Sequence, residues 1–257
     1  MLNIFVPIIF GLCLGVASAT NYCKYNCPGI QHIGCNHNGN WKASCPKDRA
    51  LVSLSAAEKK VILSYHNEYR NIIAGGSGNR LPAACRMATM QWDDELAYLA
   101  SLNVKTCTMT HDNCHNTPAF QYSGQNLAWV SYNGVLNVTD KASVCFKMWY
   151  NELPHVNRDI VTSFPAVYNG PVIGHVTVMA ADRNTHVGCA ASTYSSSGNF
   201  YKIFLIACNY ATNNLYGVKV YDACSKPATK CTTGVNPKYK FLCSPKEVYD
   251  VNNISFG

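Results

Sequence analysis

Hydrophobic residues follow a helical spacing in two stretches of the first half of the chain. Ser55 and Glu58 form a capping-box sequence, and the apolar residues behind it recur every three or four positions until Gly75-Gly76. This predicts a helix with His66 and Arg70 beside its apolar stripe. The stripe consists of Val61, Ile62, Tyr65, Tyr69, Ile72 and Ile73. A second helix is predicted from Trp92-Asp93-Asp94-Glu95, where acids favour the first turn, to Cys107. Its inward residues are Leu96, Ala100 and Val104.

A third helix is predicted from about Thr139 to Leu153, because Pro154 cannot continue it. Its buried stripe comprises Cys145, Met148 and Trp149. Glu152 continues this stripe at the next turn, where a carboxylate is costly unless it is paired or bound to a cation. The alternative is that Glu152 reaches solvent at a fraying helix end.

Alternating apolar and polar positions predict strands in the second half of the chain. They cover His175–Ala181, His186–Tyr194 and Phe200–Tyr210, and the last two are joined across Ser195-Ser196-Ser197-Gly198-Asn199. Cys189 and Cys208 are equidistant from this turn, so a hairpin places them opposite each other and predicts a disulfide between them.

The chain begins with an apolar, uncharged run that ends in Ala17-Ser18-Ala19. This pattern is typical of a secretory signal peptide, so residues 1–19 are expected to be removed and the protein to be secreted and extracellular. Thirteen of the 14 cysteines then remain, in a compartment where disulfides persist, and the odd number leaves one without an internal partner.

The cysteines also indicate how the mature chain is organised. Residues 20–50 have the spacing C-x3-C-x7-C-x9-C and almost no apolar periodicity, so covalent bonds are expected to hold them. His32 and His37 raise zinc binding as an alternative to disulfides there. Residues 51–212 form the main domain, and residues 213–257 form a cysteine-containing tail.

Charge and short motifs restrict the possible functions further. The net charge is +7 with scattered basic residues and no nucleic-acid-binding motif, so a solvated basic surface or contact with an anionic surface is expected and a nucleic-acid partner is not. Neither H-E-x-x-H, a P-loop nor a nucleophile elbow is present. Asn137 and Asn253 begin N-glycosylation acceptor sequences, which suggests a glycoprotein.

An ordered set of motifs over about 190 residues resembles the CAP superfamily of cysteine-rich secretory proteins, antigen 5 and pathogenesis-related proteins. The resemblance is greatest to the antigen 5-like venom allergens of insect venom and saliva. Its motifs are His66-Asn67-Glu68-Tyr69-Arg70, His111-Asp112-x-Cys114, Gly124-Gln125-Asn126-Leu127, Trp149-Tyr150-Asn151-Glu152, Gly174-His175-x-Thr177, Val187-Gly188-Cys189 and Cys208-Asn209-Tyr210.

The resemblance implies an α+β fold, a three-layer α-β-α sandwich with a disulfide-pinned N-terminal segment and C-terminal tail. It implies a cleft carrying His111, Gln125, Glu152 and His175, with His66, Asn67 and Arg70 as a structural motif. The bridges implied are Cys23–Cys35, Cys27–Cys114, Cys45–Cys107 and Cys189–Cys208. Cys85–Cys145 is then a plausible fifth pair and Cys231–Cys243 a sixth, which leaves Cys224 odd and allows either a monomer or a Cys224-linked dimer.

The residues expected at this cleft could bind a metal ion or take part in catalysis. Two imidazoles and a carboxylate can hold a divalent cation such as Zn or Mg reversibly, although no cofactor is required, and a purely structural hydrogen-bonded network is the alternative. Gln125 stands where many family members have Glu, and an amide cannot serve as a general base. We therefore expect no enzymatic activity, with a metal-dependent hydrolase that uses Glu152 and His175 as the rival hypothesis.

The resemblance implies a secreted binding protein that acts as an allergen. Its partner would be a small hydrophobic ligand, such as a sterol, fatty acid or eicosanoid, or a host haemostatic or immune protein. Residues 170–173, with Phe164 and Tyr168, could line a lipid crevice, although such residues more often simply pack. An endogenous protein of the gut or reproductive tract is a further alternative.

Overall fold

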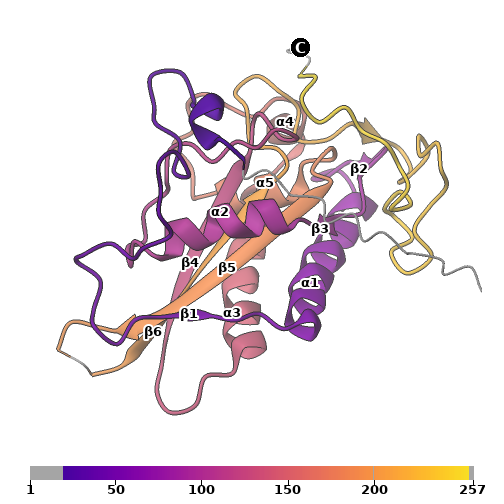
Figure 1. Cartoon of the computed structure of the whole chain (residues 1–257). Helices are drawn as coiled ribbons and strands as arrows, with labels where there is room; N and C mark the ends of the chain where they lie inside the picture. Colours follow the sequence, from indigo (N-terminus) through magenta and orange to yellow (C-terminus); the bar gives the residue numbers. More distant parts are fainter. Residues whose placement is uncertain (1–19, 199, 255–257) are drawn as a thin grey trace, which may run out of the picture.

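The computed structural model describes residues 20–198 and 200–254, so the predicted signal peptide lies outside the described residues. Helices and strands form a three-layer α-β-α arrangement (Figure 1). The helices are α1 (Ala56–Gly75), α2 (Asp94–Val104), α3 (Val138–Tyr150), α4 (Arg158–Thr162) and α5 (Gly174–Ala180), with short 3-10 turns at Tyr22–Tyr25 and Leu153–His155. The strands are β1 (Ala50–Val52), β2 (Ala83–Ala84), β3 (Gln91–Trp92), β4 (Gly124–Tyr132), β5 (His186–Ser195), β6 (Lys202–Tyr210) and β7 (Ala223–Cys224).

The central sheet has the strand order β1-β5-β6-β4, all antiparallel, and β3 adds to β5 in parallel. Along β6, Phe204, Ile206 and Cys208 face α1, α3 and α5, whereas Leu205 and Ala207 face α2. In Figure 1, α2 crosses in front of the sheet and α3 stands behind it. Because helices cover both faces, the strand is apolar at nearly every position.

Local sequence signals position the helices as predicted. The Ser55 hydroxyl accepts a hydrogen bond from the Glu58 amide, and the Glu58 carboxylate accepts one from the Ser55 amide. Asp93 caps α2 in a similar way, through the Leu96 amide. Gly188 of β5 allows α2 to approach, because a Cβ there would lie 2.1 Å from the Ala97 nitrogen.

Two predictions about local structure were wrong. The strand predicted over His175–Ala181 is helix α5, in which Val176 to Ala180 are all buried, so burial on every side conceals the helical period. Met148, predicted to be buried, is 50% exposed on α3, whereas Cys145 and Trp149 are buried as predicted. Glu152 lies beyond the end of α3, in the turn that follows it.

Six disulfides join the described cysteines. Five follow the predicted pairing: Cys23–Cys35, Cys27–Cys114, Cys45–Cys107, Cys189–Cys208 and Cys231–Cys243. The Cys85–Cys145 pairing was wrong, because Cys85 is bonded to Cys224 and Cys145 is a free thiol on the buried face of α3. Cys224 is therefore not available for a disulfide-linked dimer. All four cysteines of residues 20–50 form disulfides, which confirms the prediction that covalent bonds hold this segment.

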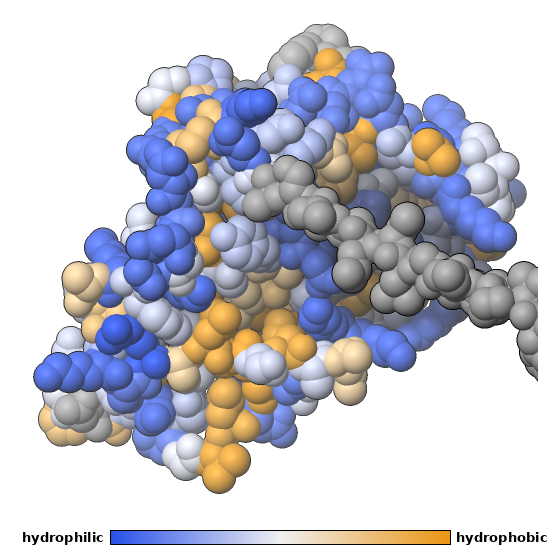
Figure 2. Space-filling view, viewed as in Figure 1, coloured by the Kyte–Doolittle hydropathy of each residue, from blue (hydrophilic) through white to orange (hydrophobic). Residues whose placement is uncertain are grey.

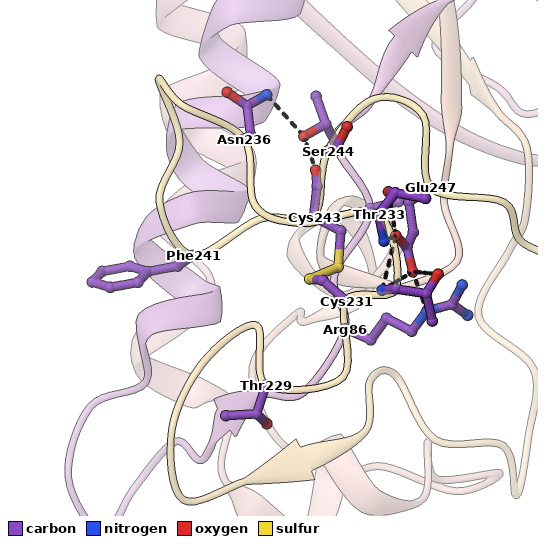
Figure 3. The surroundings of a disulfide bond; sticks show 12 residues. Arg86, Thr229, Cys231, Thr233, Asn236, Phe241, Cys243, Ser244 and Glu247 are labelled. Carbon is purple, nitrogen blue, oxygen red and sulfur yellow. Dashed lines mark hydrogen bonds and ion pairs between the residues drawn. A yellow bond between two sulfur atoms is a disulfide. The ribbon is translucent and has the colours of Figure 1, made fainter.

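The C-terminal tail is fixed to the domain by polar contacts as well as by disulfides. Around the Cys231–Cys243 bridge, the Glu247 carboxylate accepts hydrogen bonds from Thr232, Thr233 and Arg86 (Figure 3). Burial alone would raise the pKa of Glu247, but these donors outweigh it and hold the pKa at about 2. The tail is thus an integral part of the folded domain.

Two observations bear on localisation and modification. Within residues 20–198 and 200–254, no helix has the length and apolar character needed to cross a bilayer. Asn137 is exposed at the start of α3, where its Oδ1 accepts from the Asp140 amide at 3.1 Å. Its Nδ2, the atom that carries a glycan, is not needed for this cap. Asn253 is also exposed, but Ser255 of its acceptor sequence lies outside the described residues.

Candidate functional site

A cleft of about 420 Å³ opens where β4, α5 and the loop of residues 111–116 meet. It contains His111, Gln125 and His175 of the predicted set, so the structure brings these three to one site. Most of the other lining side chains are polar, and they come from three segments of the chain. They include Asp112, Asn113, His115, Asn116, Ser123, Asn126, Asn213 and Asn214.

Glu152 lies behind His175 and not on the cleft wall. Its Oε1 is 2.5 Å from His175 Nδ1, and its Oε2 accepts from the backbone amides of His175 and Val176 at 2.9 and 3.1 Å. The carboxylate therefore orients the imidazole and holds the first turn of α5. The His175 ring also lies parallel to the buried Trp149 ring, with centroids 6.1 Å apart. Both contacts leave His175 Nε2 as the free ring nitrogen.

Gln125 orients the second imidazole. Its Nε2 donates to Asp112 Oδ2 at 2.5 Å and to Asn209 Oδ1 at 2.9 Å, so its Oε1 is the atom that faces His111 Nδ1 at 2.9 Å. Because an amide oxygen only accepts, His111 must carry its proton on Nδ1. The His111 Nε2 lone pair is then free at the exposed side chain.

Asp112 is the centre of this network, and the sequence analysis did not assign it a role. Its carboxylate also accepts from Asn103 at 2.9 Å and pairs with His115 Nδ1 at 2.6 Å. Burial alone would raise the pKa of Asp112, but His115 and the two amide donors outweigh it, and the pKa lies below its usual range. Asp112 follows His111 directly in the quoted motif, and that position was the available signal.

Few side chains at the cleft are placed to act as ligands of a cation. Among the described residues, the one group of three ligand-type side chains with donor atoms within 4.8 Å of one another is His66, Cys189 and Cys208. These two cysteines form a disulfide, and both ring nitrogens of His66 have partners, so that group cannot bind a metal. At the cleft, the protein offers two free imidazole nitrogens and no convergent third ligand.

Comparison with known proteins supports the architecture. The model of the cysteine-rich secretory protein (CAP) family matches residues 63–210, more than half of the chain. The chain belongs to the CAP family. The CAP protein described here is 38% identical to Venom allergen-1 of Aedes albopictus over 88% of each chain, and 32% identical to Tabinhibitin 3 of Tabanus yao over 93% of this chain and 92% of that one. The crystal structure of NaASP2 with Zn²⁺ superposes with a TM-score of 0.61 at 25% identity, covering 78% of this chain and all of that one.

The remaining motif of this CAP protein, His66-Asn67 with Arg70, is buried in α1 and does not reach the cleft. His66 Nδ1 lies 2.8 Å from the Ile62 carbonyl oxygen and must donate to it, so Nε2 accepts from the Tyr210 hydroxyl at 2.9 Å. Asn67 exchanges two hydrogen bonds with the backbone of Met90.

Arg70 is fully buried and donates five hydrogen bonds to four backbone carbonyls: those of Ala88, Met179, Ala181 and Asp182. Burial lowers its pKa to about 10, so the guanidinium stays charged at neutral pH. It ties α1 to the C-terminal end of α5, the helix that carries His175.

Asn126 extends this arrangement towards the cleft. Its Nδ2 donates to the His175 carbonyl oxygen at 3.0 Å and to the Tyr210 hydroxyl at 3.2 Å, which is the hydroxyl that contacts His66. The buried motif is therefore connected to the cleft through Tyr210 and Asn126. His186, by contrast, packs against Phe120, with ring centroids 5.4 Å apart, in a hollow bordered by the tail.

Proposed function

We propose that this CAP protein is a secreted binding protein of the insect salivary or venom type that engages a host protein. The observation that carries the proposal is the state of the two carboxylates at the cleft. Asp112 and Glu152 each accept three or more hydrogen bonds from protein donors, and Gln125 replaces the second acid expected of the family. These groups position imidazoles and are poorly placed to activate water.

The relatives support the same proposal. Several of them are named venom allergen, antigen 5 like allergen or tabinhibitin, from Aedes albopictus, Culicoides nubeculosus, Tabanus yao and Solenopsis invicta. An apolar N-terminal run and six disulfides fit export to an oxidising compartment. Most of the residues that line the cleft have polar side chains, which offer a protein partner more hydrogen-bonding groups than a sterol or fatty acid could use.

The residues proposed for a lipid crevice support that ligand less well. Phe164 packs against a buried cluster that includes Val161 and Ile173, and its ring stacks on that of Tyr216 with centroids 6.1 Å apart. Val172 is 63% exposed, but it borders the polar cleft. Phe164 and Ile173 are thus explained by packing, whereas Tyr168 and residues 170–172 are exposed.

Reversible binding of a divalent cation is part of the proposal. His111 and His175 would hold it through Nε2, and Gln125 and Glu152 would fix the two rings through their contacts with Nδ1. With only two protein ligands, the affinity is expected to be modest. The cation would supply a positive charge and open coordination positions at the mouth of the cleft.

Calorimetric titration with Zn²⁺ tests the cation site. We expect His175→Ala to abolish binding and Glu152→Gln to weaken it about 10- to 100-fold, because the carboxylate that contacts His175 Nδ1 is lost. His155→Ala is the control, since His155 is exposed and its ring has no hydrogen-bond partner among the described residues. Equal binding by all four proteins would refute the site.

The partner class requires a separate experiment. The purified protein should inhibit platelet aggregation or prolong clotting at stoichiometric concentration if a host haemostatic protein is the target. Mass spectrometry of extracted lipid is the parallel measurement: a stoichiometric sterol, fatty acid or eicosanoid without an effect on haemostasis would favour the small-ligand alternative. Metal-stimulated ester or peptide hydrolysis that disappears in His175→Ala would overturn the binding proposal in favour of a hydrolase.

A further inference from the structure

A second pocket, of about 440 Å³, lies between the N-terminal segment and the end of α2, away from the cleft described above. Its floor is apolar, formed by Ile33 and Leu102 together with the half-buried Trp41. Its rim carries only neutral polar and basic side chains, and no acidic residue lines it. The rim residues are His37, Asn38, Asn40, Lys42, Lys105 and Thr106.

Two side chains on the pocket rim, His37 and Lys105, form hydrogen bonds with the backbone of Gly39. Gly39, in the left-handed region at φ 79°, donates its amide hydrogen to His37 Nδ1 at 2.8 Å and accepts a hydrogen bond from Lys105 Nζ at 2.8 Å. Burial, with Lys105 nearby, lowers the pKa of His37, so the ring is neutral and its proton is on Nε2. The Lys105 ammonium keeps two further N–H donors. The donors on this rim are therefore positioned by the backbone before any ligand binds.

The positive charge continues outside the pocket. Between residues 20 and 57 the basic residues are Lys24, Lys42, Lys47 and Arg49, and Asp48 is the one acid. Asp48 is already engaged by the Ser195 amide and hydroxyl and lies 3.7 Å from Lys202. Figure 2 shows mainly hydrophilic residues along the left edge of the molecule, where this segment runs in Figure 1.

Trp41 links the pocket to the basic residues beyond it. The Arg49 guanidinium lies 5.9 Å from the Trp41 ring centroid, and Lys42 follows Trp41 directly on the pocket rim. A small anion would contact the rim alone. A longer polyanion would contact Lys42 and Lys105 in the pocket and Lys47 and Arg49 outside it.

We propose that this surface, the Trp41 pocket with Lys47 and Arg49, binds a sulfated polysaccharide. A sugar ring would lay its C–H face on the indole and the apolar floor, while sulfate groups accept hydrogen bonds from Lys42 and Lys105. Sulfates on neighbouring sugars would reach Lys47 and Arg49. Since the binding releases counterions, the affinity falls as salt rises.

Titration calorimetry with a heparin hexasaccharide at several salt concentrations tests the proposal on the full mature chain. We expect Lys42→Glu/Lys47→Glu to lower the affinity at least about tenfold and to reduce the slope of log affinity against log salt by about two. The matched control is Lys226→Glu/Lys246→Glu, which changes the net charge equally at exposed lysines of the tail. The affinity of this control for heparin should fall by less than about threefold.

Two further measurements define the chemistry. Trp41→Ala should weaken binding but leave the salt slope unchanged, because it removes sugar stacking and no charge. A hyaluronan hexasaccharide, which carries carboxylates but no sulfates, should bind at least about tenfold more weakly than heparin. The proposal is overturned if the tail control loses as much affinity as the Lys42 and Lys47 variant, if hyaluronan binds equally, or if heparin does not bind. Thermal unfolding of both double variants shows whether they are folded.

Discussion

Arg70→Lys is the substitution that most directly tests the buried link between α1 and α5. The five hydrogen bonds of Arg70 use all the N–H groups of the guanidinium and reach carbonyls of two separate segments. A lysine keeps the charge but offers three N–H groups on one atom. At least two of the five hydrogen bonds must be lost, and carbonyls such as those of Met179 and Ala181 would be left unpaired inside the protein.

A hydrogen bond to a charged group contributes about 1.5–3 kcal/mol, so the loss of two predicts a decrease of about 3–6 kcal/mol in the free energy of unfolding. In a protein of this size each kcal/mol changes Tm by about 2–4 °C, which gives a decrease of roughly 6–24 °C. Because Arg70 donates hydrogen bonds to the end of α5, the substitution should also lower the affinity for any ligand whose binding depends on the orientation of His175.

Urea unfolding, followed by circular dichroism with the disulfides intact, measures this change. Arg158→Lys is the control, because Arg158 is exposed and should change stability by less than about 0.5 kcal/mol. If Arg70→Lys changes the free energy of unfolding by less than about 1 kcal/mol, the five bonds do not stabilise the protein as argued.

Three further predictions concern pH, the free thiol and the tail. Burial lowers the pKa of His66 from 6.5 to about 4, so the unfolded state binds its proton first and stability is lost as the pH falls from 6.5 towards 4. Urea unfolding should show the wild type losing about 3 kcal/mol more than His66→Gln between pH 7 and pH 4, and equal losses would contradict this. Cys145 should resist thiol reagents in the native mature protein and react once per chain after unfolding, whereas a dimer on a non-reducing gel would argue against the pairing described. Cys85→Ala/Cys224→Ala should cost about 2–5 kcal/mol and expose the tail to limited proteolysis, and an uncleaved tail would show that its polar contacts suffice.

The disulfides show how far sequence patterns lead and where they stop. Cys189 and Cys208 could be paired from the chain alone, because a hairpin turn equidistant from both fixes their register. Cys85 and Cys224 are 139 residues apart, and no local signal relates them. Their pairing depends on where the tail crosses the domain, so elimination assigned Cys85 to Cys145, which in fact lies on the buried face of α3 as a free thiol.

The candidate site, too, was predictable from the sequence only in part. The motifs identified His111, Gln125 and His175, and the structure places all three in one cleft. Glu152 was expected as a ligand, but its three donors turn it into the residue that orients His175.

The sequence by itself determined the helix starts, the hairpin and the Cys189–Cys208 disulfide, because caps, turns and residue spacing act between near neighbours. The membership of the CAP family and the bridges of the N-terminal segment followed from the resemblance of the motifs to that family. Only the tertiary structure decided that residues 174–180 are helical. Their burial on all sides removes the polar face that would reveal the period, and the Glu152 carboxylate that holds the first turn comes from a different part of the chain. Only the folded chain could likewise show that Asp112 fixes the orientation of the Gln125 amide, and through it the free nitrogen of His111.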